Sequence, residues 1–497
     1  MTVSPRPAAA QNMAQAPVQG RWIAMTILLV AQFMNLIDVT IVNVALPSMQ
    51  TAFQATSSQI EWVVAAYILV FALLLLPSGR LGDILGRRRM FIAGVAVFTL
   101  GSALCGMAPS IGGLVGARVF QAVGAAMMTP QTLAIIPVLF APHERGAAFA
   151  LTGLTAGLAA VAGPVLGGWL IGADLFGLGW RPIFLVNIPV GLAAIVLALR
   201  YLPKLKGVPG LSLDVVGTLI AAVALLLVIF PLIEGRQIGW PWWCFAMMAA
   251  AVPVAGLFLG WLKRQEGRNG AQVIPASLFR NRGFVLGTAL SALFFSGIPG
   301  FFLVLALYLQ VGYHLTPLHS GMTTLPFSIG VLLSSVLSGR LGPRLLRPRI
   351  MAGSLMLAAA MLWLRLIVQG TGDEVVSLSF APALLIGGVG LGTAISPLFQ
   401  TILANVGGRD TGSASGGLQA FQQMGGAFGV AIMGQIFFST LTREMATGGN
   451  PHLAYATALT HAVFYNMLVF AVLAALVWLL PKPAGGAMPH AAPPVEV

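Results

Sequence analysis

Few ionisable side chains stand inside the long apolar runs of this sequence, and three of them could exchange a proton or hold a charged ligand. Asp38 stands in the run 22–46 and Arg118 in the run 111–136, while Glu61 begins a further run. A charge inside a bilayer is costly, so such residues generally mark function. A carboxylate that alternates between a cation partner and a proton is suited to coupling proton movement to another event. The alternative is a fixed pair that only orients two helices.

Asp38 and Arg118 lie at similar depths if their runs form antiparallel helices. At helical rise, Asp38 is about nine residues or about 14 Å from the end of its run, and Arg118 is about eight residues or about 12 Å from the start of its run. We therefore expect a direct or water-bridged pair if the two helices face each other. Asn35 and Gln121 are candidates for the same polar site, because amides within a span seek polar partners. Glu61 is either a second acidic site or a helix-start glutamate favoured by the helix dipole.

Composition places these residues in a membrane. The chain has 497 residues, of which 58% are hydrophobic and 8% charged, whereas soluble domains carry about 25% charged residues. A spanning helix needs about 20 apolar residues, and this predicts an all-α membrane protein with fourteen spans, at 22–46, 60–78, 90–108, 111–136, 147–172, 182–201, 213–233, 243–262, 284–309, 320–338, 350–369, 378–403, 416–440 and 458–480. The net charge of +13 does not indicate nucleic acid, because the cations fall in short segments between apolar runs, where they set topology. The expected partner is the lipid bilayer.

The distribution of Lys and Arg predicts the orientation. The segments before the first run and after every second run hold most of the cations, which places both termini in the cytoplasm. Residues 1–21 form a cytoplasmic tail, and residues 481–497, rich in Pro and Ala, form a disordered tail. The expected location is the cell inner (plasma) membrane.

An internal repeat predicts two related halves. The pentapeptide Ser-Gly-Arg-Leu-Gly occurs at 78–82 and again 260 residues later, at 338–342. We expect each copy to form a tight, glycine-rich turn facing the membrane surface, although two basic loops could also arise from ordinary topology rules. The repeat divides the chain into a six-helix bundle, two inserted helices, a cytoplasmic linker and a second six-helix bundle, at 22–201, 202–263, 264–283 and 284–480.

The sequence offers no chemistry for a cofactor or metal. Cys105 and Cys244 are more than a hundred residues apart and have no metal-ligand spacing, so we expect two unrelated buried thiols. The phosphate-binding pattern Gly-x-x-x-x-Gly-Lys-Ser/Thr does not occur in the sequence, so direct ATP coupling is not expected. An integral membrane enzyme acting on lipids would need carboxylates or histidines clustered near an interface, and none has useful spacing.

Several motifs resemble a known family. The stretch 79–89, Gly-Arg-Leu-Gly-Asp-Ile-Leu-Gly-Arg-Arg-Arg, is similar to the signature between helices two and three of the major facilitator superfamily. Stretches 36–47, 118–124 and 180–191 resemble motifs of its drug:proton antiporters with fourteen spanning helices. The fifth-helix antiporter motif of that family matches Gly153, Gly157, Gly163, Pro164, Gly167 and Gly168. The second repeat departs from the pattern, with Pro343 in place of the acid and Leu346 in place of the last glycine.

The resemblance implies an exporter, not an enzyme, that works by rocking two halves around a central cavity. It implies proton-coupled export of amphipathic or cationic small molecules, with protons and the small-molecule substrate as partners and no cofactor. The glycines of helix five would let the opposite half approach closely. An exporter of one metabolite, peptide or siderophore, a lipid-modifying membrane enzyme and a non-transporting receptor stay open, as does a periplasmic adaptor with an outer-membrane channel. By the resemblance, the inner gate consists of Gly79, Arg80, Gly82, Asp83, Gly86, Arg87 and Arg88.

Overall fold

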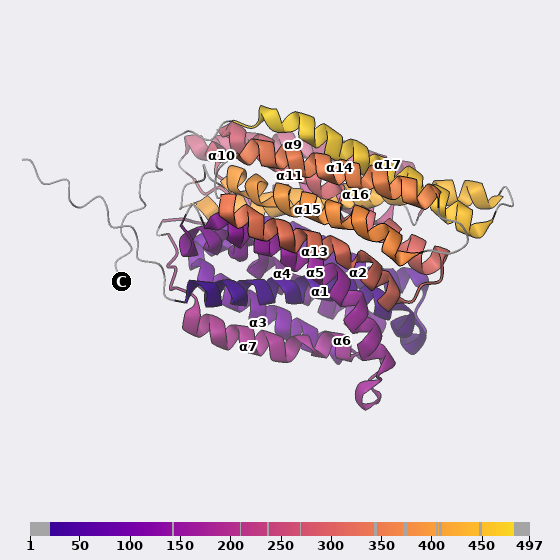
Figure 1. Cartoon of the computed structure of the whole chain (residues 1–497). Coiled ribbons are helices and arrows are strands. Elements are labelled where there is room, and N and C mark those ends of the chain that lie inside the picture. The colour runs from indigo at the N-terminus through magenta and orange to yellow at the C-terminus, as the bar shows by residue number, and fades with distance from the viewer. Residues whose placement is uncertain are drawn as a thin grey trace, which may run out of the picture.

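The computed structural model is a bundle of long helices that run side by side (Figure 1). It describes residues 20–141, 144–208, 210–235, 238–268, 270–341, 345–370, 376–403, 406, 410–446 and 450–481. No strand occurs in these ranges. The helices are α1 (Arg21–Phe53), α2 (Ser57–Leu85), α3 (Arg87–Gly106), α4 (Ile111–Leu139), α5 (Arg145–Gly172), α6 (Pro182–Leu185), α7 (Asn187–Tyr201), α8 (Val215–Glu234), α9 (Trp242–Gly267), α10 (Ala276–Arg280), α11 (Arg282–Ser296), α12 (Pro299–Leu307), α13 (Pro317–Leu341), α14 (Leu346–Gln369), α15 (Ser377–Leu403), α16 (Thr411–Ala446) and α17 (Pro451–Leu476), with short turns η2 (Leu175–Gly177), η3 (Tyr308–Gly312) and η5 (Val477–Leu479).

The helices agree with the predicted spans. Within the described ranges, 13 segments are long and apolar enough to cross a membrane. The remaining predicted span, 320–338, coincides with α13, part of whose side chains lie outside the described ranges. Two predicted spans are interrupted, at Val186 between α6 and α7 and at Gly297–Ile298 between α11 and α12. A proline follows each interruption. Proline has no N–H to donate to the carbonyl four residues before it, and this missing hydrogen bond breaks the helix.

The prediction of a loop at the first repeat was wrong in its extent. Gly79, Arg80, Gly82 and Asp83 all lie within α2, which continues to Leu85. The turn to α3 is made by Gly86 alone, whose φ of 96° is in the region that favours glycine. Close packing of this part of α2 on neighbouring helices overrides the low helix propensity of its glycines. The side chains of the second copy, at 338–342, lie outside the described ranges.

Contacts between helices define the positions of the two predicted halves. In the first half, α1 packs on α5 and α7, α2 on α4, and α3 on α4 and α7. In the second half, α15 packs on α13 and α14, α14 on α17, and α11 on α16. The halves meet where α2 packs on α16 and α5 packs on α13 and α15.

The helices α8 and α9 form a hairpin beside the halves. They pack mainly on each other, and α8 also contacts α2 and α16. Asp214 caps the start of α8 by accepting a hydrogen bond from Gly217 N at 2.7 Å, and its carboxylate also accepts one from Trp261 Nε1 of α9 at 3.0 Å. Buried Asp214 therefore fixes the two helices to each other.

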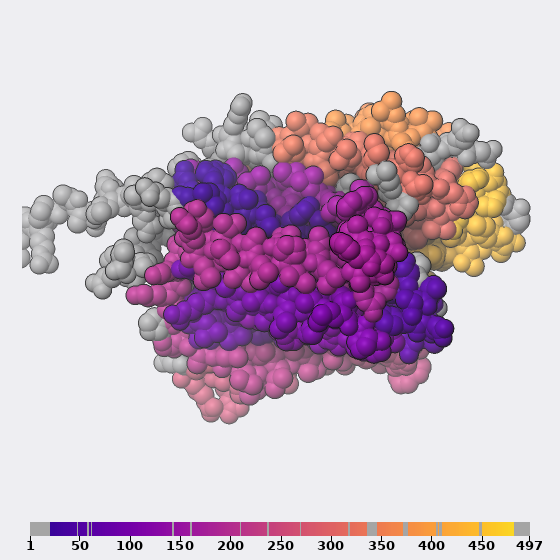
Figure 2. Space-filling view, turned by 90° about the horizontal axis from the view of Figure 1, so that it is seen from below, coloured from indigo at the N-terminus to yellow at the C-terminus, as the bar shows by residue number. Residues whose placement is uncertain are grey.

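One end of the first half carries most of its cations, and we name it the basic end. Arg21 at the start of α1 forms a 2.7 Å ion pair with Glu144, next to the start of α5. Arg88 in the first turn of α3 donates to Leu199 O near the end of α7, and Arg145 Nη2 donates to Pro137 O of α4 at 2.9 Å. Figure 2 shows the face of this half on which magenta α7 lies beside indigo α1.

Candidate functional site

Asp38 and Arg118 form a buried ion pair within the first half. Asp38 lies in the middle of α1, where its side chain is fully buried, and Arg118 of α4 is 1% exposed. Arg118 Nη1 donates a hydrogen bond to Asp38 Oδ2. The direct pairing expected from the matching depths is therefore present in the structure.

The second carboxylate oxygen of Asp38 is held by two amides. Gln121 Nε2 donates to Asp38 Oδ1 at 2.8 Å, and Asn187 Nδ2 donates to the same oxygen at 3.2 Å. Both amides also donate to Ser102 Oγ, at 2.7 Å and 3.3 Å. Four helices, α1, α3, α4 and α7, thus supply one hydrogen-bonded network, which satisfies the carboxylate from two sides.

Arg118 has further contacts that do not involve Asp38. Its Nε donates to Val63 O of α2 at 3.2 Å, and its Nη1 donates to Gln121 Oε1 at 2.6 Å. The guanidinium carbon lies 4.1 Å from the centre of the Tyr67 ring, a cation–π geometry. Tyr67 OH in turn donates to Asn35 Oδ1. The guanidinium therefore keeps polar and aromatic partners even if the carboxylate changes its protonation state.

The structure gathers four of the five predicted members into this one site, which we name the Asp38 site. It holds Asp38, Arg118 and Gln121 in one network, and Asn35 joins through Tyr67. Glu61 is the fifth residue of α2, but its side chain is outside the described part of the chain. Sequence reasoning missed three members that contact the others, Ser102, Tyr67 and Asn187. Of these, Asn187 gave a signal, since it is an amide within a predicted span.

The chemistry of the Asp38 site is that of an exchangeable ion pair. A buried pair contributes little net stability, whereas loss of one partner leaves an uncompensated charge at a cost of about 3–5 kcal/mol. Asp38 Oδ2 has Arg118 as its donor, while Oδ1 already accepts two hydrogen bonds. Oδ2 is therefore the oxygen at which a proton would replace the arginine.

A second acid, Asp83, joins the two halves at the basic end. Its Oδ1 accepts from Gly412 N at 3.0 Å, and its Oδ2 accepts from Ser413 N at 2.9 Å and from Ser413 Oγ at 3.2 Å. These donors belong to the first turn of α16, where the positive end of the helix dipole favours an anion. Arg87 Nη2 donates to Asp83 Oδ1 at 3.0 Å, and Arg80 lies 3.6 Å from Asp410 Oδ1. The acid of the first repeat thus holds a helix of the other half by its N-terminus.

Glycines bring these two helices into close contact. A methyl group at Gly79 would lie 2.3 Å from Gly412 O, which leaves no room for a side chain. A methyl group at Gly82 would likewise meet the Gln131 side chain of α4, and one at Gly86 would meet Leu205 O, so these two glycines pack on the first half and on the segment directly after it. Gly79, Asp83 and Arg80, with Arg87 holding Asp83, form the contact between the halves that we name the basic-end joint. Arg88 does not take part in the cross-half contact, because it donates to Leu199 O of α7.

The predicted packing motif of α5 faces two different neighbours. Ser328 Oγ of α13 donates to Gly157 O at 3.0 Å, and Gly153 lies against Ile395 of α15, so these two positions contact the other half. Gly163 and Gly167 pack on Thr40 and Ile41 of α1 in the same half. Pro164 is inside the helix, and Gly168 has open space beside it. Only part of the motif therefore meets the opposite half in this structure.

Two further predictions concern the cysteines and possible metal ligands. Cys105 and Cys244 are both buried and free, as predicted. In the described ranges, no three His, Cys, Asp or Glu side chains form a group that could hold a metal ion.

The all-helical bundle with its buried acid–arginine pair defines a polytopic membrane transporter. The chain belongs to the Major Facilitator Superfamily, whose family model matches residues 28–430. It is 40% identical over 426 residues to a probable actinorhodin transporter of Streptomyces coelicolor, covering 86% of this chain and 74% of that protein. It is 33% identical over 431 residues to the multidrug resistance protein Stp of Mycobacterium tuberculosis, covering 85% and 76%.

A solved structure confirms the fold. The proton:xylose symporter XylE superposes with a TM-score of 0.63 at 13% identity, over 94% of this chain and 97% of that one. The predicted fold class is therefore confirmed, and the family model confirms the predicted family.

Proposed function

We propose that this protein exports amphipathic or cationic small molecules in exchange for protons, as a multidrug efflux transporter. The observation that carries the proposal is the Asp38 site, a buried carboxylate paired with Arg118 in a span of a transporter family. The names of the two relatives, one for an antibiotic and one for multidrug resistance, support export of small molecules.

Proton coupling would operate by exchange at Asp38 Oδ2. A proton arriving there takes the place of the hydrogen bond from Arg118, while Gln121 and Asn187 keep Oδ1 fixed. Arg118 stays in place through Val63 O, Gln121 Oε1 and the Tyr67 ring. Protonation would therefore change the charge of the site by one unit while the remaining hydrogen bonds stay in place. A cationic substrate and a proton would exclude each other there.

Alternating access would use the basic-end joint as its inner gate. In this conformation the joint holds α2 against α16, and we assign it to a state closed at the basic end. The two halves would be 22–201 and 284–480, with 202–263 as inserted helices and 264–283 as a linker.

The basic end would face the cytoplasm of a cell whose plasma (inner) membrane holds the protein. The clustering of arginines at this end, among them Arg21, Arg88 and Arg145, supports that orientation through the positive-inside rule. Both termini would then be cytoplasmic.

Asp38→Asn in everted membrane vesicles tests the proposal. Addition of ethidium to energised wild-type vesicles should release protons, and Asp38→Asn should abolish this release and ethidium transport. Because Arg118 would be left uncompensated, the double variant Asp38→Asn/Arg118→Gln serves as a control for folding: it should regain thermal stability without regaining transport. Asp174→Asn, a change at an exposed acid outside the spans, should behave as wild type. Unchanged substrate-induced proton release in Asp38→Asn would refute the proposal.

Export of one specific compound is the second candidate, because one relative is named for the transport of a single compound. Susceptibility of a deletion strain to a chemically varied panel separates the two. Sensitivity to several unrelated compounds supports multidrug export, and sensitivity to one compound supports the specific exporter.

A further inference from the structure

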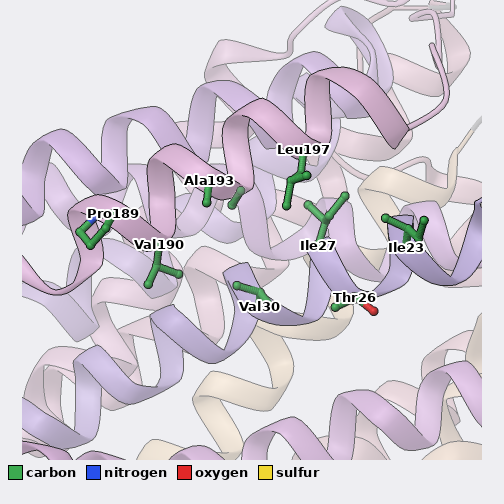
Figure 3. A pocket seen from close by; sticks show the side chains of 9 residues that line it. Ile23, Thr26, Ile27, Val30, Pro189, Val190, Ala193 and Leu197 are labelled. Carbon is green, nitrogen blue, oxygen red and sulfur yellow. The ribbon is translucent and has the colours of Figure 1, made fainter.

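An apolar groove runs along the outside of the first half between α1 and α7. Its volume is about 430 Å³, within the range of small-molecule sites. Figure 3 shows the side chains of the two helices facing each other across it. The lining residues are Ile23, Thr26, Ile27, Val30, Pro189, Val190, Ala193, Ala194 and Leu197. The one polar side chain, Thr26, turns its hydroxyl to Trp22 O of its own helix, so the groove offers a guest only apolar contacts.

The mouth of the groove at the basic end is cationic and aromatic. Arg200 and Tyr201 follow Leu197 by three and four residues on α7, and so lie on the face that lines the groove. A methyl group at Gly20, next to the start of α1, would lie 3.7 Å from the Tyr201 ring, which places that ring across the mouth. Arg200 is exposed, and its guanidinium carbon lies 5.7 Å from the centre of the same ring.

The length of the groove matches one leaflet of a bilayer. It runs from Ile23, in the first turn of α1, to Val30, and from Leu197 back to Pro189 on α7. At helical rise this is about 10–12 Å, most of the half-thickness of a hydrocarbon core about 30 Å thick. A guest therefore has an apolar part about one leaflet deep and a charged part at the basic end.

We propose that this groove binds one anionic phospholipid from the leaflet at the basic end, with an acyl chain between α1 and α7 and its phosphate at Arg200. Charge complementarity selects the headgroup, since basic residues beside spanning helices attract anionic lipids. Tyr201 takes the position at the membrane interface that tyrosines favour.

The bound lipid would also affect the Asp38 site, a consequence that rests on the proposed function. Pro189 lines the groove two residues after Asn187, whose amide donates to Asp38. The acyl chain therefore lies between α1 and α7. Farther along these two helices, the Asn187–Asp38 hydrogen bond joins them. An empty groove would let the two helices approach and would slow transport.

Native mass spectrometry tests the binding independently of transport. The full-length protein is reconstituted in nanodiscs of equal parts phosphatidylglycerol and phosphatidylcholine, and the retained lipids are counted. We expect wild type to retain phosphatidylglycerol in preference to phosphatidylcholine. Ala193→Phe, which fills the groove, should lose one bound phosphatidylglycerol, while Val196→Phe, at an exposed position of α7 outside the lining, should keep it.

A charge variant tests the headgroup contact without filling the groove. Arg200→Gln should weaken phosphatidylglycerol retention roughly fivefold, and Arg264→Gln, at an exposed cation in the last turn of α9, should leave it unchanged. Equal retention of the two lipids by wild type, or no loss in Ala193→Phe and Arg200→Gln, would overturn the proposal. A wild-type dimer that Ala193→Phe converts to a monomer would also overturn it, because a second copy would then occupy the groove. Lipid loss without any change in transport would refute only the link to the Asp38 site.

Discussion

Replacement of Asp83 by asparagine should open the basic end of the molecule. Each oxygen of Asp83 accepts a backbone N–H from the first turn of α16, from Gly412 at 3.0 Å and from Ser413 at 2.9 Å. Asparagine has one carbonyl oxygen and one NH₂ group, so one of these two N–H donors would face another donor. The substitution also removes the negative charge from the positive end of the helix dipole.

The two losses set the size of the effect. A hydrogen bond to a charged group contributes about 1.5–3 kcal/mol, and a charge at a partly buried helix terminus contributes up to about 2 kcal/mol. A total of about 3 kcal/mol changes the ratio of closed to open states by a factor of about 100. A state with the basic end open at 1% would thus rise to near half of the molecules.

Distance measurements between two spin labels can detect this change. Leu85 at the end of α2 and Leu345 before α14 are 52% and 64% exposed, and they belong to opposite halves. With both native cysteines replaced, labels at Leu85→Cys and Leu345→Cys should give one short distance in the parent protein. Asp83→Asn should add a longer distance of comparable amplitude.

The matched control for Asp83→Asn is Arg89→Gln, a change at an exposed cation of the same segment. It should leave the distance distribution unchanged. If Asp83→Asn also leaves the distribution unchanged while the protein stays folded, Asp83 does not hold the basic end closed.

Two further predictions concern the joint and the Asp38 site. Gly79→Ala should abolish transport but not membrane insertion, because its methyl group would lie 2.3 Å from Gly412 O. The control Gly116→Ala, whose methyl group has nothing within 4 Å, should transport normally. A transport assay on membranes with equal amounts of each variant compares them. Asn187→Ala should lower thermal stability by about 1–2 kcal/mol, since it removes hydrogen bonds from a buried network, and should slow proton-coupled transport through its lost contact with Asp38. Normal transport with reduced stability would limit Asn187 to a structural role.

The fold and the centre of the Asp38 site could be predicted from the sequence for a simple reason. Spanning helices are fixed in length and direction by the bilayer, so residue counts become depths. Asp38 and Arg118 were expected at the same depth from those counts, and the structure pairs them.

Rotation of the helices about their own axes could not be predicted in this way. Ser102, Tyr67 and Asn187 belong to the Asp38 site because α3, α2 and α7 turn these faces toward α1, and residue counts carry no information about that angle. The same limit applies to α5, where Gly163 and Gly167 were expected on the opposite half and pack on α1.

The partners of Asp83 were hidden for a different reason. The resemblance placed Asp83 in the inner gate, but its donors are backbone N–H groups more than 300 residues later in the chain. Every residue except proline carries such a donor, so no residue type marks the partner. Only the approach of α2 and α16, permitted by glycines on both helices, identifies it.

The Asp38 site and the basic-end joint share one helix, and this suggests how they communicate. Near its start, α2 contributes Val63 O and the Tyr67 ring to Arg118, and near its end it contributes Gly79 and Asp83 to α16. The two sets of contacts are about 24 Å apart at helical rise, so no residue of one set touches the other.

A displacement of α2 as a packed unit can connect the two sites, because every contact named above depends on its position. Protonation of Asp38 changes the hydrogen bonds of Arg118, and Arg118 is bonded to α2 through Val63 O. A small shift of α2 would in turn separate Gly79 from Gly412, a contact too tight to deform gradually. We infer that α2 has two positions and that each site changes the balance between them. Two sites that bias the same two-state element are coupled.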